Sequence, residues 1–344
     1  MVFDRDGWPT LLVLRALGLG DLLTSVPVLR ALAGAFPDHL RILAAPSALA
    51  PLAALTGAVD EVVDTAPLAP LDCTPGRVDI AVNLHGKGPQ SHRVLLAARP
   101  RRLISYANPE VPESADGPPW HEGEHEVARW CRLLEAYGIP ADPDLLDIDL
   151  PPELLAAAPD TERGATLIHP GAASNARRWP VERFAAVARS ESERGRRVVI
   201  TGGPEEVDLA YAVARRAQLE TSAVYAGRTG LLELAALVAL ADRVVCGDTG
   251  VAHLATALRT PSVVLFGPVP PTEWGPPPGR PWHRALWAGD RGDPHAAHPD
   301  RGLLAISVSD VLEALARLPE ATPSYRGGRE PIQIAVGMAF REES

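Results

Sequence analysis

The sequence predicts an α/β protein built from two Rossmann-like halves, each with a parallel sheet covered by helices. Short apolar runs alternate with longer stretches of helical apolar spacing, which is typical of parallel strands joined by helical crossovers. This alternation occurs in two successive series. The 344 residues also exceed what one core needs and suit two domains of about 150 residues each.

The first series begins close to the start of the chain. The apolar run Thr10–Leu14 predicts a strand, and a glycine-containing turn leads to a predicted helix over Asp21–Ala33. Further strands are expected at Leu40–Ala45, Glu61–Asp64 and Val78–Leu84. These elements predict an N-terminal domain over residues 1–150, and the acidic, proline-bearing stretch 140–159 is the expected hinge.

The second series predicts a C-terminal domain over residues 151–318. The strands expected there are Ala165–His169, Arg197–Thr201, Arg243–Cys246 and Ser262–Phe266, and the helices are Val181–Glu193, Glu205–Gln218, Leu231–Ala241 and Gly250–Leu258. The stretch Pro268–Pro299, rich in Pro, Gly, Trp and His, predicts a long surface loop.

The end of the chain is expected to add a helix and a tail. The late helix 308–318 is a candidate to pack back on the N-terminal domain. Residues 319–344 predict a polar tail with an apolar patch at Ile332–Phe340.

Composition excludes several classes of function. The formal charge of −10, with Lys87 as the only lysine, argues against a partner nucleic acid. The odd, widely spaced cysteines fit a reducing compartment, and we expect the cytoplasm; they are Cys73, Cys131 and Cys246.

One apolar stretch, Leu11–Leu32, resembles a membrane segment in composition. Three charged residues interrupt it, namely Arg15, Asp21 and Arg30, and no cleavage site follows a basic region. We therefore expect neither a signal peptide nor a membrane span, while contact with a membrane surface stays open.

The first candidate site lies in the turn after the first strand. Gly18 and Gly20 would let the backbone approach a ligand closely, and Asp21 stands at the mouth of the next helix. A carboxylate there can take the proton of an incoming hydroxyl group as a general base. The alternative is a helix cap, a position that aspartate favours. The spacing does not complete a GxGxxG pattern, which disfavours a dinucleotide cofactor.

The second candidate site is LIHPGAASNARRWP, between a strand and a helix. Small residues such as Gly171 leave backbone N–H groups available to a phosphate, and Arg177 and Arg178 add positive charge. Arginine can neutralise the charge that develops on a departing diphosphate. A polar turn with two solvated arginines is the alternative.

A third glycine turn, ITGGPEE, places Glu205 in the first turn of a helix. Its carboxylate can hold a ribose or a base. The alternative is that it only offsets the positive end of the helix dipole.

The most informative segment is VVCGDTGVAHLATAL, in which a strand ends in a tight turn and a helix follows. The helix start at Thr249 and Gly250 offers unpaired N–H groups to a diphosphate. Asp248 would repel phosphate, so we expect it to bind a hydroxyl group. His253 lies about one turn further on and can reach the same ligand; the alternative is a histidine satisfied within the core.

Taken together, these motifs resemble glycosyltransferase family 9, the heptosyltransferases of the lipopolysaccharide inner core. The resemblance rests on LGLGD, HPGA…RRWP, TGGPEE and GDTGVAHLATAL followed by LFGP, in this order and spacing, and covers most of Leu11–Pro268. It implies a GT-B fold whose two domains face each other across a cleft, with the acceptor in the N-terminal domain and the nucleotide sugar in the C-terminal one. It also implies inversion at the sugar and no metal requirement.

Carried over by position, the resemblance assigns roles to particular residues. Asp21 matches the general base and Arg177 the basic residue at the diphosphate, where lysine is usual in the family. Donor-binding positions are Gly171, Glu205, Asp248, Thr249, Gly250 and His253. The implied co-substrate is a nucleotide sugar, such as an ADP-activated heptose, without any further cofactor.

The acceptor side matches the family less closely. Gly20 and the segment NLHGKGPQSH, with His85, Lys87 and His92, are candidates to contact an acidic acceptor; a solvated loop is the alternative. The acceptor itself, whether glycan, glycolipid or small molecule, is left open.

Two other functions are compatible with the same motifs. One is a nucleotide-sugar epimerase or hydrolase, and the other is a non-catalytic nucleotide-sugar-binding protein. A metal site at His295 and His298 is disfavoured because that loop lacks other ligands at useful spacing.

Overall fold

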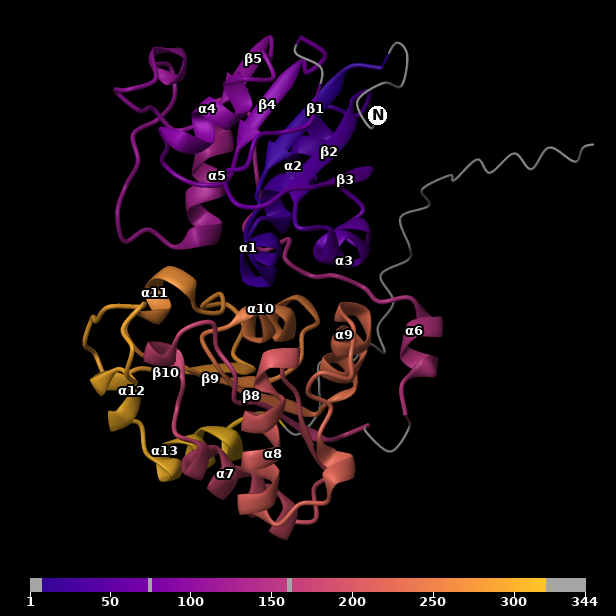
Figure 1. The fold of residues 1–344 in the computed structure, drawn as a ribbon, viewed down its shortest axis with the longest axis vertical. Coiled ribbons are helices and arrows are strands. Elements are labelled where there is room, and N and C mark those ends of the chain that lie inside the picture. Colours follow the sequence, from indigo (N-terminus) through magenta and orange to yellow (C-terminus); the bar gives the residue numbers. More distant parts are fainter. Residues whose placement is uncertain (1–7, 74–75, 160–162, 320–344) are drawn as a thin grey trace, which may run out of the picture.

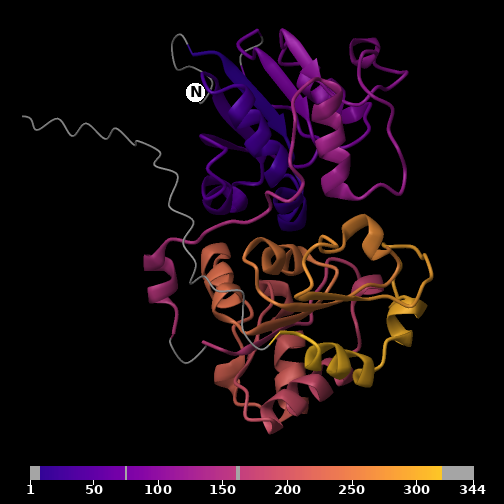
Figure 2. The same ribbon diagram turned by 180° about the vertical axis from the view of Figure 1, so that it is seen from behind.

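The computed structural model describes residues 8–73, 76–159 and 163–319. These residues form two five-stranded sheets, one in each half of the molecule (Figures 1 and 2). Every pairing of named strands in both sheets is parallel. The predicted α/β class with two Rossmann-like halves is confirmed.

The first sheet has the strand order β3-β2-β1-β4-β5. All five residues of β1 are buried, because helices cover both faces of a parallel sheet. Its bounds are β1 Thr10–Leu14, β2 Leu40–Ala45, β3 Glu61–Asp64, β4 Ile80–Asn83 and β5 Arg102–Ile104.

The predicted helix over Asp21–Ala33 is two helices in the structure, α1 (Leu19–Thr24) and α2 (Val26–Ala35). Pro27 stands in the first turn of α2, where a missing N–H costs nothing, and this favours a new start at Ser25. The other α-helices before the connecting segment are α3 Ala50–Ala54, α4 Gln90–Leu96 and α5 Glu126–Ala136.

The second sheet has the strand order β10-β9-β8-β6-β7. Its bounds are β6 Thr166–His169, β7 Val198–Ile200, β8 Arg243–Gly247, β9 Ser262–Leu265 and β10 His283–Leu286. Strand β10 lies inside the stretch 268–299 that we predicted to be loop, so that prediction is wrong there. Its sequence, HRAL, is too short and polar for a strand signal, and its edge position requires only one neighbour.

The helices that we predicted for the second half occur in the predicted order, but three short α-helices were not predicted, one of them (Pro271–Trp274) inside the stretch 268–299 expected to be loop. Their bounds are α6 Pro152–Ala157, α7 Val181–Glu193, α8 Val207–Ala217, α9 Leu231–Leu240, α10 Gly250–Ala257, α11 Pro271–Trp274, α12 Arg301–Ala305 and α13 Val308–Ala316. Helix α13 packs on α7 and the second sheet, with Val311 and Leu315 buried in that core. The expectation that it packs on the first half is therefore wrong: its apolar face is already covered by the half that precedes it. The predicted tail, including Ile332–Phe340, lies outside the described residues from residue 320 onwards.

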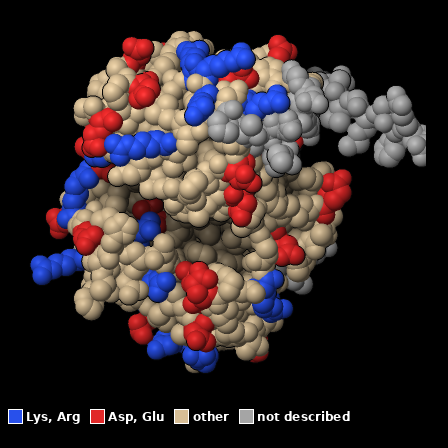
Figure 3. Space-filling view, turned by 45° about the horizontal axis from the view of Figure 1, so that its top comes forward, with Lys and Arg blue, Asp and Glu red and all other residues tan. Residues whose placement is uncertain are grey.

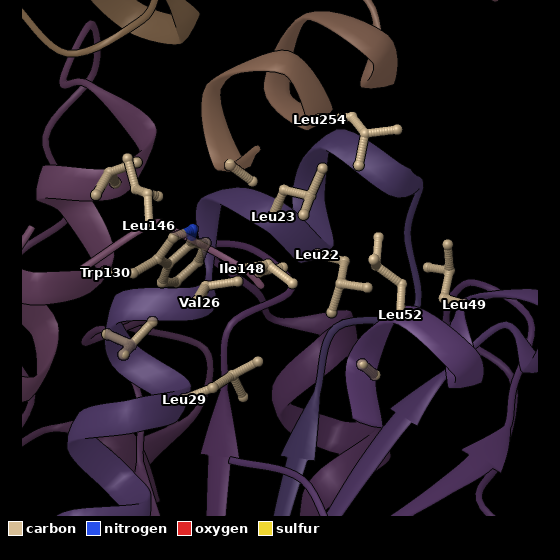
Figure 4. Close-up of a cluster of buried hydrophobic side chains, with 14 of the residues drawn as sticks. Leu22, Leu23, Val26, Leu29, Leu49, Leu52, Trp130, Leu146, Ile148 and Leu254 are labelled. Carbon is tan, nitrogen blue, oxygen red and sulfur yellow. The ribbon is translucent and has the colours of Figure 1, made fainter. Parts of the chain in front are cut away.

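The two halves share one hydrophobic cluster. Leu254 of α10 lies near Leu23 of α1, and Leu22, Trp130, Leu146 and Ile148 belong to the same cluster (Figure 4). The halves are thus held together by packing as well as by the connecting chain.

The connecting segment is bound by arginines from both halves. Arg30 of α2 donates to the carbonyl oxygens of Leu145 (2.8 Å) and Asp147 (2.7 Å). Arg259 and Arg280 of the second half pair with the Asp147 carboxylate at 3.1 and 2.6 Å.

Within the described ranges, no helix combines the length and apolar character that crossing a membrane requires.

Candidate functional site

The candidate site lies where the carboxyl ends of the two sheets face each other. Helix α1 of the first half is in direct contact with α10 of the second (Figure 1). The molecular surface is hollowed between the halves, with acidic and basic side chains at the rim (Figure 3). In open parallel sheets, ligands bind at such strand ends.

Two glycines allow α1 and α10 to approach closely. A Cβ atom on Gly20 would lie 2.7 Å from Cδ2 of His253, and one on Gly250 would lie 2.8 Å from Cβ of Leu19. Both separations are shorter than an ordinary van der Waals contact between carbon atoms. Gly20 was predicted to contact the acceptor. In the structure it lies against His253 of the other half, where a larger residue would not fit.

Asp21 lies in α1, and its side chain is one-quarter exposed. Its Oδ2 accepts a hydrogen bond from Gly18 N at 3.2 Å; Gly18 is the N-cap residue, so Asp21 does not occupy the N-cap position of the alternative interpretation but binds back to it from the third helical position. Its Oδ1 lies 3.1 Å from Nη2 of Arg15. Burial raises the pKa of Asp21, the charge of Arg15 lowers it and that of Glu126 raises it, with a net upward shift. The side chain helps to cap the helix and is also a carboxylate of increased basicity beside the hollow.

Arg15, which follows β1, is the buried centre of this region. Its guanidinium donates to the carbonyl oxygens of Asp21 (3.1 Å) and Leu84 and to Oε1 of Glu126 (2.9 Å). It also lies 4.9 Å from the ring centroid of Trp130. These contacts join the ends of β1 and β4 to α1 and α5.

Glu126 begins α5 and is buried together with Arg15. Burial raises its pKa, but the charges and hydrogen bonds of Arg15, Trp130 and Arg129 outweigh this and hold the pKa below its usual value. The carboxylate is thus kept ionised. Local sequence patterns did not reveal Arg15 and Glu126 as a pair, because they are 111 positions apart.

The second half contributes Asp248, which follows β8 and is buried. Burial raises its pKa, Arg177 lowers it and Asp21 raises it, and the result is about 6. Oδ2 of Asp248 lies 3.9 Å from Nη1 of Arg177, which also donates to the Asp248 carbonyl oxygen at 3.4 Å. The effect of Asp21 on the pKa of Asp248 places the predicted base and the predicted donor-binding segment in one electrostatic environment.

Two buried polar groups near Asp248 have few partners among the described residues. Nε of Arg177 is buried without a hydrogen-bond partner there. Thr249 precedes α10 with an extended backbone; in the described part of the chain its buried Oγ1 has no oxygen or nitrogen partner, but it contacts the Cys246 thiol, whose pKa burial and Asp248 raise and this contact lowers. Buried polar atoms usually have partners, so these two groups are candidates to bind a ligand.

His253 packs against the ring of Trp274 at a centroid distance of 5.9 Å. Burial, the neighbouring His125 and Arg15 lower its pKa, and Glu126 raises it, to give about 4. It is therefore a neutral imidazole at pH 7, able to form hydrogen bonds but not to supply charge to a phosphate.

The glycine turns after β6 and β7 lie together. Glu206 is buried, accepts a hydrogen bond from Gly203 N at 2.8 Å and occupies the space where a side chain on Gly171 would stand. Its Oε2 is 3.9 Å from Nε2 of His169. Glu205, the predicted nucleoside contact, is exposed beside it. Sequence reasoning did not single out Glu206, although TGGPEE contains it.

The acceptor-side candidates separate in the structure. His85 lies near Arg15, and burial and that charge lower its pKa; its Nδ1 is buried without a partner among the described residues. Lys87 is exposed and pairs with Glu122 at 2.7 Å. His92 is fully buried, with its ring nitrogens near Tyr106 O (2.8 Å) and Asn83 Nδ2 (3.2 Å), so the expectation that it contacts an acceptor is wrong.

His295 and His298 are both exposed. In the part of the chain that the structure describes, no group of three or more His, Cys, Asp or Glu side chains is arranged to hold a metal ion.

Comparison with known proteins agrees with this arrangement. The family model of glycosyltransferase family 9 (heptosyltransferase) matches residues 117–292, just over half of the chain. Lipopolysaccharide heptosyltransferase 3 of Escherichia coli is 32% identical over 168 residues, which cover 47% of this chain and 48% of that protein. The chain thus aligns with about half the length of this curated relative.

Solved structures of the family share the whole fold. The family 9 glycosyltransferase of Veillonella parvula superposes with a TM-score of 0.74 at 21% identity, covering 90% of this chain and 96% of that one. The E. coli heptosyltransferase WaaC with ADP-2-deoxy-2-fluoro heptose gives a TM-score of 0.67 at 18% identity, covering 89% and 99%. These similarities confirm the GT-B fold. With its motifs, its two facing sheets and the family match, the chain belongs to glycosyltransferase family 9 (heptosyltransferase).

Proposed function

We propose that this protein is an inverting glycosyltransferase that moves a heptose-like sugar from an ADP-linked donor to an acceptor hydroxyl, with Asp21 as general base. One observation carries the proposal: the Asp21 carboxylate, whose pKa is raised, lies at the contact between α1 and α10, across from the Asp248–Gly250 turn of the second half and the buried Nε of Arg177, which has no partner among the described residues. A displacement reaction needs a general base on one side and groups that bind the leaving diphosphate on the other, and this arrangement supplies both.

The donor diphosphate would lie at the start of α10. The free N–H groups of that helix end, the Thr249 hydroxyl and the Arg177 guanidinium would bind its oxygens. Gly171 and Glu205 are proposed to lie along the nucleoside, and Asp248 and the neutral His253 to contact sugar hydroxyls. The ADP-2-deoxy-2-fluoro heptose held by the solved E. coli enzyme supports an ADP-heptose donor.

The reaction would be a single displacement. The acceptor oxygen forms a bond to the anomeric carbon while the bond from that carbon to the diphosphate oxygen breaks, and the configuration is inverted. The hydroxyl proton passes to Asp21, and ADP leaves with the electron pair, its charge offset by Arg177 and α10. His85 and Lys87 are proposed to help hold the acceptor.

The proposals for the acceptor and the location rest on a relative's name and on the cysteines. The E. coli relative is named for lipopolysaccharide, so we propose a lipopolysaccharide-type acceptor. The three free cysteines support action in the reducing cytoplasm.

The test is Asp21→Asn, which keeps the size of the side chain and the oxygen that caps Gly18. With ADP-heptose and heptose-free lipopolysaccharide, turnover should fall about a thousandfold, while the Kd for ADP, from calorimetry, stays within about twofold. Near-normal turnover would remove Asp21 from this role. Wild-type protein that consumes ADP-heptose without any acceptor would indicate an epimerase or hydrolase instead, and ADP binding without turnover would indicate a binding protein.

A further inference from the structure

Arg15 forms an ion pair with the Asp21 carboxylate but directs its hydrogen bonds to other groups. Its Nη2 lies 3.1 Å from Oδ1 of Asp21, but the hydrogen bonds of this nitrogen run to Oε1 of Glu126 (2.9 Å) and Oγ1 of Thr24 (3.4 Å). Nε and Nη1 donate to the main-chain carbonyl oxygens of Asp21 and Leu84. Arg15 therefore holds the backbone of α1 in place without a hydrogen bond to the side chain of the proposed base.

Glu126 is itself fixed from the other side. Nε1 of Trp130 donates to its Oε1 at 2.8 Å, and Nε of Arg129 donates to its Oε2 at 3.1 Å. Both donors are buried. A carboxylate with three such partners keeps one position, and so does the Arg15 nitrogen that it binds.

We propose that Glu126 is a positioning residue for the proposed base: by binding Nη2 of Arg15, it limits the contact of Arg15 with Oδ1 of Asp21 to an ion pair, so that Oδ1 can receive the proton of the acceptor. This inference rests on the proposed function of Asp21. Glu126 touches neither donor nor acceptor in this role and acts only through Arg15.

The surrounding charges support this arrangement. Asp21 is faced by Arg15 at the end of β1, by Glu126 of α5, by Asp248 of the second half and by the neutral His253 of α10. Burial raises the pKa of Asp21, Arg15 lowers it and Glu126 raises it. Removing the charge of Glu126 takes away one effect that raises the pKa of Asp21. It also lets Arg15 form a hydrogen bond with the Asp21 carboxylate, which lowers that pKa further. Both changes make Asp21 a weaker base.

The experiment is an NMR titration of the Asp21 carboxyl carbon in full-length protein with ¹³C-labelled aspartate, the signal being assigned by its loss in Asp21→Asn. In Glu126→Gln the titration midpoint should fall by about one pH unit. Glu124→Gln is the matched control, because Glu124 is an acid two residues away that pairs with Arg132. It should leave the midpoint unchanged. An unchanged midpoint in folded Glu126→Gln would overturn the proposal.

A second variant covers a failure of Glu126→Gln to fold. Thr24→Val removes the other acceptor of Nη2 without changing any charge, and should lower the Asp21 midpoint by about half a unit. If the midpoint does not fall, the bond to Thr24 does not keep Arg15 from forming a hydrogen bond with the Asp21 carboxylate. The titration needs no turnover, so its result does not depend on the proposed reaction. If the midpoint shifts in Glu126→Gln but Asp21→Asn turns over normally, the proposed function is refuted and the positioning role of Glu126 is not.

Discussion

The surroundings of Asp21 and of Asp248 are built on opposite plans. Around Asp21, Nε, Nη1 and Nη2 of the buried Arg15 all donate hydrogen bonds within the protein. Around Asp248, Nε of Arg177 is buried without a partner among the described residues, and the buried Thr249 hydroxyl has only the Cys246 thiol beside it there. The arginine of the first region is thus satisfied within the protein, although the described residues offer no partner to the buried Nδ1 of His85 near it. The arginine of the second region keeps a donor for a ligand. We therefore expect changes in the second region to alter ligand binding, and changes in the first to alter turnover and stability.

The largest effect that sharpens this contrast should come from Arg177→Ala. The variant loses the proposed charged donor to the diphosphate, and a hydrogen bond to a charged group contributes about 1.5–3 kcal/mol. The Kd for ADP, measured by calorimetry, should rise about thirtyfold. The control is Lys87→Gln. Lys87 is a cation of the first half that pairs with Glu122, and its replacement should leave the Kd for ADP unchanged. Unaltered ADP binding by Arg177→Ala would break the comparison.

Gly20→Ala tests the seam between the two regions. The added methyl group would lie 2.7 Å from Cδ2 of His253 and should force α1 and α10 apart. Overpacking of this kind costs about 1–3 kcal/mol, so the free energy of unfolding in urea should fall by that amount. In the control, Gly86→Ala in the same half, the new Cβ meets no atom within 4 Å. Equal stability of the two variants would show that the seam does not depend on close approach.

The smallest effect concerns the pH dependence of donor binding. The pKa of Asp248 is about 6, so this side chain is mostly charged at pH 7.5 and mostly neutral at pH 5.5. Its negative charge opposes the diphosphate only when it is ionised. Asp248→Asn should therefore bind ADP about fivefold more tightly than wild type at pH 7.5, and less than about twofold more tightly at pH 5.5. A ratio of affinities that does not change with pH would place Asp248 away from the diphosphate.

Most of the fold could be predicted because its signals are local. Strands such as β1 and β9 are apolar runs between turn residues, and GDTGVAH combines a strand end with a helix start in one segment. Strand β10 was missed because four residues at a sheet edge carry too little pattern.

The candidate site was predictable only in part, for a related reason. Glu126 and Arg15 meet through tertiary packing, and neither position shows this in its own neighbourhood. Choosing between Glu205 and Glu206 requires knowing which residue stands third in the helical turn after Gly203, and element boundaries are the least certain part of a sequence prediction.

The connecting segment 140–150 is attached unequally to the two halves. Arg30 holds it through neutral carbonyl oxygens. The second half also binds neutral groups, with Arg280 on the carbonyl oxygen of Asp144 and Ile148 N on that of Ala257, and it adds ion pairs from Arg259 and Arg280 to the carboxylate of Asp147. Dissolved ions screen attraction between opposite charges far more than they weaken a bond to a peptide oxygen. Concentrated electrolyte should thus weaken the hold of the second half on this segment more than that of the first half, while the bonds to peptide oxygens remain on both sides.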